Sequence, residues 1–371
     1  MKLTFVVSEA YDGTTDDMEA MTARREYSIA VRIEFIGRSY GYMSAKDNSF
    51  RGFLITLPFR NSNKIMLRLQ TPVTDERCKV GISYSDKIMM LGSCFSENIG
   101  VQLKNFGFDV CINPFGVLYN PVSVLNSVER MLDIRQFSLE DCIQIGAGDT
   151  RFCSFSHHTS FAREEAETFL LDANMALEEA AEHFRKCNKV IITLGTSWCF
   201  RHLERDFIVS NCLKRPAAEF RRERLTVQET AAALHRIIDL CDARAAEDPG
   251  FAPKQFIFTV SPMRHFKDGA HGNQISKSTL LLGIEEVVSG LSALCNCPDG
   301  QDVTADYFPA YEIVMDELRD YRFYAEDMCH PSSQTVDYLR ERFLAWALPP
   351  EEHQLLEDNI RRFKHSHHRP H

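Results

Sequence analysis

The sequence predicts a three-layer α/β/α sandwich built on a mainly parallel sheet. Four short apolar runs recur along the chain, each ends on small polar residues, and helical periodicity follows each of them. Such alternation of strand and helix is typical of parallel sheets covered by helices on both faces. The predicted strands are residues 88–92, 108–112, 190–194 and 255–260. In sheets of this kind the ligand lies outside the carboxyl ends of the strands.

Composition narrows the class of protein. The chain has 371 residues, 44% hydrophobic and 25% charged, with a formal net charge of −10, which is an ordinary soluble globular mixture. No apolar run approaches the roughly 18 residues of a membrane span, and no secretion signal is evident. The acidic balance argues against a nucleic-acid partner, because phosphate binding needs clustered Lys and Arg. Twelve cysteines without a disulfide framework favour reduced thiols and a cytoplasmic location.

Residues 1–65 differ from the rest of the chain. Polar fragments dominate them, and residues 27–36 could at most form a lone strand. We expect residues 1–65 to be a non-native or poorly ordered N-terminal extension, with Met66 as the native initiator; the alternative is a small accessory β-element. The α/β domain then spans residues 66–347, and residues 348–371 form a polar C-terminal tail.

The first predicted strand ends at Gly92 and Ser93, and helical spacing resumes near Ser96. A serine here stands beside the free N–H groups of a helix start, which stabilise developing negative charge. Ser93 is therefore placed where an acyl-transfer nucleophile would need to be; the alternative is that it is only a turn or N-cap residue. The neighbouring Cys94 carries a more nucleophilic group, but we expect its side chain on the opposite side of the turn, in the core.

The second predicted strand ends in a loop with two Asn and two Pro residues, 113–121. Gly116 in this loop lets a backbone N–H approach a ligand closely, or merely permits a turn. His157 and His158 precede a predicted helix over residues 163–186, and they either line a pocket or lie in solvated loop.

Metal ligation is not indicated by the sequence. His157 and His158 have no Cys or carboxylate nearby to complete a site. Cys295 and Cys297 form the only close cysteine pair, and without a second pair a zinc site is not expected.

The third predicted strand ends at residues 195–198 and is followed by a charged excursion over the sheet, residues 201–224. A capping-box sequence at Thr226 then opens a helix. The fourth strand ends at residues 261–265, and a long helix over about residues 274–294 follows.

Near the end of the chain, residues 307–319 predict a helix, and a closing helix ends at about Ala347. Between them, Asp327 and His330 stand three residues apart, directly before Pro331. This spacing lets the Asp orient the His from one loop, although loops before helices commonly contain Asp.

Several of these segments resemble the motifs of one family, in the correct order. Leu91-Gly-Ser-Cys-Phe-Ser-Glu-Asn98 closely matches the signature of the GSCFA family, in which alanine usually occupies the position of Ser96. The other blocks that resemble the family are residues 113–121, 193–198, 261–265, 271–277 and 321–331. The resemblance covers about residues 66–345 and also extends to the wider SGNH/GDSL hydrolases.

The resemblance implies a flavodoxin-like, SGNH-type fold and serine-dependent ester chemistry without a cofactor. Ser93 falls on the nucleophile, His330 on the base and Asp327 on the acid that orients it. Gly116 falls on the second oxyanion block. In the third block, the usual Gly-x-Asn-Asp is replaced by Gly-Thr-Ser-Trp, so Ser197 stands where an Asn amide would donate, with a shorter and more mobile hydroxyl.

In the implied chemistry, His330 takes the proton of Ser93 and returns it to the leaving alcohol. The Ser93 hydroxyl should then lie about 2.6–3.2 Å from the His330 ring, with the N–H of Gly116 pointing above Ser93. The N–H groups of Ser93 and Gly116, with Ser197 or Asn273, would receive the oxyanion. The residues expected to line the oxyanion and substrate site are Gly116, Ser197, Asn273, Asn113, His265, Arg264, His157 and His158.

We also expect a cation near Ser93, drawn from Arg264, His265 and Lys277, which would suit an anionic or strongly polar acyl acceptor; alternatively Arg264 pairs with a structural carboxylate. Two functions remain open. One is an ester hydrolase or O-acyltransferase acting on a small polar acyl or glycan ester. The other is a non-catalytic, ligand-binding member of the fold. Hydrolysis and acyl transfer begin with the same acyl-enzyme, so the sequence does not choose between them, and it gives no oligomeric state.

Overall fold

The computed structural model describes residues 3–9, 27–33, 71–74, 78–294 and 304–367. The chain divides into two compact units, Met1–Leu69 and Gln70–His371. Among the described residues, none of the helices combines the length and apolar character that crossing a bilayer requires.

In the first unit, strands β1 (Leu3–Glu9) and β2 (Tyr27–Ile33) pair in antiparallel fashion. The expectation of a lone strand in this region is therefore wrong, because β2 has a partner. The proposed extension over residues 1–65 falls mostly outside the described residues and stays a prediction.

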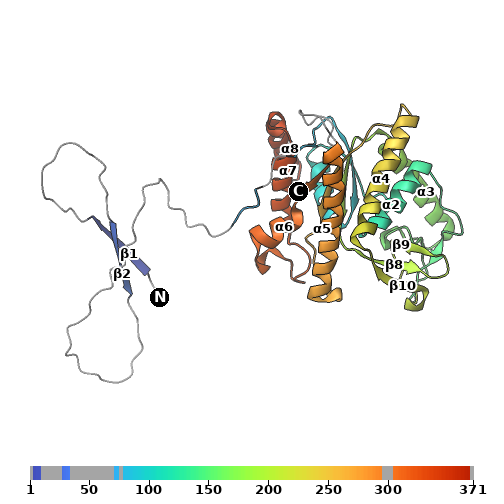
Figure 1. Cartoon of the computed structure of the whole chain (residues 1–371), viewed down its shortest axis with the longest axis horizontal. Coiled ribbons are helices and arrows are strands. Elements are labelled where there is room, and N and C mark those ends of the chain that lie inside the picture. Colours follow the sequence, from blue (N-terminus) through green and yellow to red (C-terminus); the bar gives the residue numbers. More distant parts are fainter. Residues whose placement is uncertain (1–2, 10–26, 34–70, 75–77, 295–303, 368–371) are drawn as a thin grey trace, which may run out of the picture. The chain divides into compact units, whose positions relative to one another are not determined.

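The second unit contains the predicted parallel sheet (Figure 1). It has five strands in the order β12-β11-β7-β3-β4, and every neighbouring pair is parallel. The strands are β3 (Lys87–Gly92), β4 (Asp109–Ile112), β7 (Lys189–Leu194), β11 (Gln255–Val260) and β12 (Ala305–Phe308). The α/β fold is therefore confirmed, and all four predicted strands lie in this sheet.

Numbered in chain order, the sheet reads 2-1-3-4-5, a doubly wound arrangement. The chain leaves β3 toward β4 on one side and then returns to place β7 on the other side. The strand order therefore reverses between β3 and β7, and such a switch point is where open α/β sheets bind ligands. Ser93 follows β3 directly, so the fold puts it at this point.

Both faces of the sheet are apolar and covered by helices. Successive strand side chains point to opposite faces, so Met89 and Leu91 join one core while Ile88 and Met90 join the other. The helices on the first face are α2 (Pro121–Asp133), α3 (Ala166–Lys186), α4 (Val227–Glu247) and α5 (Gly269–Leu294). Those on the second face are α1 (Cys94–Asn105), α7 (Ser333–Ala347) and α8 (His353–His367). Figure 1 shows α7 and α8 on one side of the sheet and α2, α3 and α4 on the other.

The predicted helix over residues 307–319 begins later than expected. Ala305–Phe308 is edge strand β12, and the short α6 (Ala310–Glu312) and a π-helical turn (Ile313–Leu318) follow it. A strand of four residues with partly exposed Asp306 and Tyr307 lacks the long buried run of β3, β7 and β11, which explains why the sequence pattern did not indicate it.

The charged excursion after β7 forms a small antiparallel sheet in the order β10-β8-β9. Its strands are β8 (Trp198–His202), β9 (Phe207–Val209) and β10 (Phe220–Arg224). A second minor pair joins β5 (Ile143–Gln144) to β6 (Phe152–Cys153). The capping box at Thr226 is formed as predicted, with Glu229 as its partner.

The expected polar tail after residue 347 contains helix α8. Its Leu356, Ile360 and Phe363 pack against the second core, and the Phe363 ring meets Phe106 edge-on at 6.1 Å. Part of this segment therefore belongs to the packed domain. Cys295 and Cys297 lie outside the described residues.

We predict that Gly92→Ala is strongly destabilising. Gly92 has a φ of +131°, and a Cβ there would lie 2.1 Å from the carbonyl oxygen of Thr193 in the adjacent strand. Backbone cannot yield as a flexible side chain can, so we expect a loss of about 3 kcal/mol or more in the free energy of unfolding, measured by urea denaturation.

Gly290→Ala is the matched control. Gly290 lies exposed in α5, and a Cβ added at this residue would meet nothing within 4 Å apart from its chain neighbours and the backbone of its own helix. Helix propensity therefore predicts a gain of about 0.5–1 kcal/mol. Equal unfolding free energies for the two variants would contradict the proposed contact between Gly92 and Thr193.

Candidate active site

Ser93 lies at the junction of β3 and α1. It is the N-cap of α1, and its Oγ accepts a hydrogen bond from Phe95 N at 3.3 Å. Its own N–H donates to Thr193 O in β7 at 3.1 Å. The helix begins at Cys94, two residues earlier than expected, and Ser93 is only 1% exposed. Ser93 therefore sits beneath the surface, with both its hydroxyl and its N–H engaged.

Asp327 and His330 form a hydrogen-bonded pair within one loop. Asp327 Oδ2 lies 2.5 Å from His330 Nδ1, and Asp327 Oδ1 accepts from the N–H groups of Cys329 and His330, both at 2.9 Å. These three contacts, led by the His330 side chain, lower the pKa of Asp327 to about 2. Both side chains are about half exposed. The pair thus has the predicted arrangement of a carboxylate that orients an imidazole.

The ends of β3 and β11 and the Asp327–His330 loop are linked through residues 261–265. The thiol of Cys94 lies 4.0 Å from the sulfur of Met263, and Arg264 N donates to Cys329 O at 3.0 Å. The charge of His330 also contributes to lowering the pKa of the neighbouring His265. Segments far apart in the sequence therefore meet at the carboxyl edge of the sheet, as the fold prediction requires.

Within the described residues, however, no hydrogen bond joins Ser93 to His330. The Ser93 hydroxyl caps the first turn of α1, and Ser93 is buried while His330 is half exposed. The predicted direct contact between these two side chains is therefore absent from this structure.

The expected oxyanion donors have acceptors inside the protein. Besides the N–H of Ser93, the N–H of Gly116 donates to Asn113 O at 2.7 Å. The hydroxyl of Ser197 bonds to Ser276 Oγ of α5 at 3.1 Å, and Ser197 is fully buried. The φ of Gly116 is +79°, and a Cβ there would lie 2.4 Å from the Cβ of His158, so this glycine accommodates a turn and a close neighbour.

The two asparagines hold neighbouring loops in place. Asn113 Oδ1 accepts from Gly92 N at 2.9 Å, while the buried Asn113 Nδ2 has no partner among the described atoms. Asn273 Oδ1 accepts from His265 N at 2.8 Å, and Asn273 Nδ2 reaches Gln274 Oε1 at 3.4 Å. Both side chains therefore support the loops around Ser93.

Arg264 and His265 lie at the rim. Arg264 forms no ion pair with any described residue; its guanidinium carbon lies 4.1 Å from the ring centre of Phe266 and 5.3 Å from those of Tyr321 and Tyr324. The described residues therefore do not support the alternative that Arg264 pairs with a structural carboxylate. Burial lowers the pKa of His265 to about 4, and the charges of Lys277 and His330 add to this effect.

Lys277 is a buried amine beneath the site. It is 1% exposed, and its Nζ donates to Gly195 O at 2.6 Å and to Ser261 O at 2.7 Å, joining the ends of β7 and β11. Burial lowers its pKa to about 7, with a small opposing effect from Cys94. Two carbonyl acceptors match the two N–H bonds of a neutral amine. The expected cation near the Ser93 turn is therefore one that readily loses its charge.

Two adjacent histidines have different surroundings. His157 is fully buried, with the rings of Phe137 and Phe161 at 4.6 and 4.7 Å, and its Nδ1 pairs with Ser154 Oγ. Burial, followed by the charge of Arg130, lowers its pKa to about 3. His157 is therefore a core residue and not part of the site.

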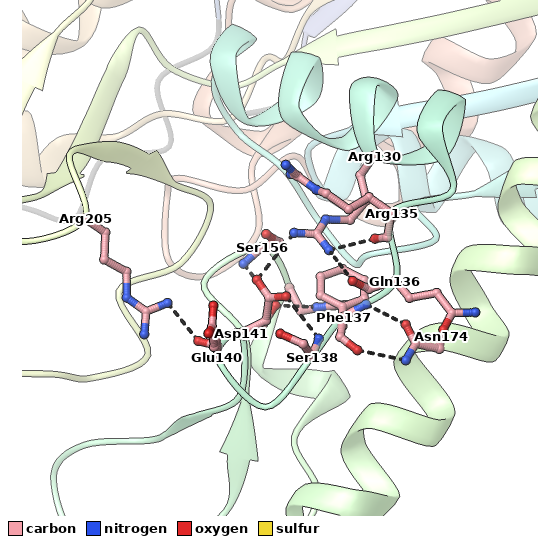
Figure 2. Close-up of polar contacts among 12 residues, drawn as sticks. Arg130, Arg135, Gln136, Phe137, Ser138, Glu140, Asp141, Ser156, Asn174 and Arg205 are labelled. Carbon is pink, nitrogen blue, oxygen red and sulfur yellow. Dashed lines mark hydrogen bonds and ion pairs between the residues drawn. The ribbon is translucent and has the colours of Figure 1, made fainter.

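Figure 2 shows the polar contacts around Phe137, whose ring packs against His157. Asn174 pairs with both backbone groups of Phe137, at 2.7 and 3.0 Å, and Arg130 lies 3.9 Å over the Phe137 ring while donating to Arg135 O. His158, by contrast, is partly exposed beside Gly116, with Nδ1 bonded to Ser160 Oγ at 3.0 Å. Of the two, only His158 borders the loop that carries Gly116.

Two residues near the site were missed by the sequence analysis. Tyr119 packs its ring over Gly195 and meets the His265 ring edge-on at 6.3 Å; burial raises its pKa to about 12. The hydroxyl of Ser276 forms hydrogen bonds with the hydroxyls of Thr196 and Ser197. Neither had a sequence signal beyond its presence in a block that resembles the family.

Cys94 is partly buried, and burial raises the pKa of its thiol. Its contact with Met263 places it at the sheet edge, not in the core as expected. Among the described residues, no group of three or more His, Cys, Asp or Glu side chains has the spacing of a metal site.

Comparison with known proteins gives one result that bears on this site. A family model described as the GSCFA family matches residues 87–343. The matched range begins at the first residue of β3, ends within α7, and includes the Ser93 turn and the Asp327–His330 loop. No match was found among curated proteins.

We predict that Lys277 makes the stability of the protein rise with pH above neutrality. Its pKa is about 7 when folded against 10.5 as the ordinary value, so between these values the unfolded chain binds more protons. The free energy of unfolding then increases with pH, by at most about 1.4 kcal/mol per unit for one proton.

The measurement is urea unfolding of the wild type and Lys277→Met at several pH values between about 7 and 9. Other groups cancel in the difference between the two proteins, so the difference itself should grow with pH. A difference that is flat across this window would mean that Lys277 stays protonated in the folded protein.

Proposed function

The chain belongs to the GSCFA family, and we propose that it is a serine-dependent ester hydrolase or O-acyltransferase of SGNH type. In this proposal Ser93 is the nucleophile, His330 the general base and Asp327 the carboxylate that orients the base. The substrate is a small polar acyl or glycan ester. Polar groups at the rim, including Arg264 and His265, favour an ester with a polar or anionic part.

The observation that carries this proposal is the Asp327–His330 pair. A carboxylate with a pKa of about 2 stays ionised at neutral pH and can only accept, so the 2.5 Å contact is one in which His330 Nδ1–H donates to Asp327. The lone pair of Nε2 is then free to accept a proton. That tautomer is what a general base acting on a serine hydroxyl requires.

The reaction would proceed through an acyl-enzyme. His330 Nε2 takes the proton of the Ser93 hydroxyl as Oγ attacks the ester carbonyl, and the same proton then leaves with the alcohol. Water or a second alcohol releases the acyl group by the reverse steps. The N–H groups at the start of α1, including that of Phe95 once Ser93 Oγ leaves it, would stabilise the oxyanion together with the helix dipole, since the donors expected from sequence are engaged elsewhere.

This mechanism needs Ser93 and His330 to come closer than they are here. Substrate binding would replace the weak contact between Ser93 Oγ and Phe95 N, which is 3.3 Å long. Catalytic hydrogen bonds are often long before substrate binds and tighten in the complex. The half-exposed Asp327–His330 pair is free on its outer side to make such a movement.

A second candidate is a ligand-binding protein without turnover. It is favoured by the burial of Ser93, which is 1% exposed, and by the internal acceptors of Gly116 and Ser197. In this case the serine is a helix cap and the loop around His330 binds a ligand.

A reactive-serine probe distinguishes the two candidates. We expect a neutral alkyl fluorophosphonate to label the wild type on Ser93, and Ser93→Ala to abolish the label. His330→Ala should slow labelling between about 10²- and 10⁴-fold, because the base no longer takes the proton. The measurement is the labelling rate, with the modified peptide identified by mass spectrometry.

Thermal unfolding of each variant is the control. His330 is half exposed, so its removal should leave the unfolding temperature nearly unchanged. A folded wild type that takes no label, or a label that survives in Ser93→Ala, would favour the binding protein.

A further inference from the structure

The loop that carries Asp327 and His330 is braced mainly from within. Ala325 N donates to His330 O at 2.8 Å, and Met328 N donates to Ala325 O at 2.9 Å. Together with the bonds to Asp327, these contacts make residues 325–330 a compact turn. The pair inside it therefore keeps its own geometry whatever the position of the loop on the domain.

One residue ties this turn to the sheet. Among the described residues, both hydrogen bonds that join residues 325–330 to the rest of the domain come from Arg264. Its N–H donates to Cys329 O at 3.0 Å, and its Nη1 donates to Met328 O at 3.2 Å. Arg264 follows β11 by four residues, so it connects the loop directly to the carboxyl edge of the sheet.

The guanidinium of Arg264 is held in place by rings. Phe266 lies at 4.1 Å and Tyr321 and Tyr324 each at 5.3 Å from its central carbon. A planar, weakly hydrated guanidinium stacks well on such faces, where an ammonium would not match them. Phe266 and Tyr324 come from opposite sides of the junction, so the side chain is clamped between the two segments that it joins.

We propose that Arg264 is a positioning residue, which sets the distance between His330 and Ser93 without touching either reacting atom. This inference rests on the proposed function. Without its side chain, residues 325–330 keep the Asp327–His330 bond but lose a hydrogen bond and the stacked contacts that fix them to the β11 end. His330 and Asp327 then move together. Their hydrogen bond is kept, while the distance from His330 to Ser93 changes.

Arg264→Met tests this directly. It keeps an apolar stem and removes the planar cation and its donor. We expect fluorophosphonate labelling of Ser93 to slow between about tenfold and a hundredfold, since misplacement by about 1 Å can cost a hundredfold. The pH dependence of labelling should keep the wild-type midpoint with a lower plateau. Arg264→Lys should stay slow, because it keeps the charge but not the planar face.

Arg205→Met is the matched control. The guanidinium carbon of Arg205 likewise lies over a ring, 5.7 Å from the centre of Phe155. Arg205 also donates to a backbone carbonyl, Glu140 O at 2.9 Å, and Figure 2 shows this hydrogen bond. Neither contact involves residues 325–330, so its variant should label at the wild-type rate.

The outcomes separate the inference from the function on which it rests. A wild type that takes no label refutes the proposed function and the inference with it. Labelling of Arg264→Met at the wild-type rate overturns only the inference. So does a shifted pH midpoint, or full activity of Arg264→Lys, since either would mean that Arg264 acts through its charge. If Arg264→Met does not fold, Tyr321→Ala removes an exposed ring of the clamp, and it should slow labelling in the same pH-independent way.

Discussion

The architecture of the site depends on how closely the ends of β3 and β7 approach each other. Gly92 and Thr193 are partners in the parallel ladder, and the next N–H, that of Ser93, still donates to Thr193 O. From the other side, Asn113 Oδ1 accepts from Gly92 N. The turn into α1 is thus fixed by both neighbouring strands. Hydrogen bonds of this kind each contribute about 0.5–1.5 kcal/mol, and here they determine where the serine stands.

Near this turn, burial favours the neutral forms of two ionisable side chains. His265 and Lys277 both have a pKa lowered chiefly by burial. Asp327, at the exposed rim, is by contrast stabilised as an anion. The site therefore combines a low-charge interior with an ionised carboxylate at its mouth, an arrangement that costs little desolvation.

The sequence was informative where its signals were continuous. Strands β3, β7 and β11 were predicted because buried strands are nearly unbroken apolar runs, and the shorter β4 because three of its four residues, Val110 to Ile112, are apolar. Strand β12 was missed because its four residues include Asp306 and Tyr307, and β10 was missed because arginines occupy its exposed positions. The Asp327–His330 pairing followed from spacing within one loop.

What the sequence could not give were partners distant in the chain. Whether the hydroxyl of Ser197 is free depends on Ser276, which is 79 positions away. Whether His157 or His158 borders the site depends on the aromatic rings that enclose only the first of them. Such choices are made by packing between segments, on which local propensity carries no information.

The containment of Asp327 and His330 within a single turn has a consequence for divergence among relatives. In arrangements that draw base and acid from separate elements, any shift of one element alters both proton affinity and geometry. Here the two properties can vary independently. Changes within residues 325–330 would alter the proton affinity of His330, while changes where this turn joins the domain would alter the distance from His330 to Ser93. Under the proposed function, replacements in the flanking segments would thus tune the rate at which the serine reacts without altering the pH range of the reaction.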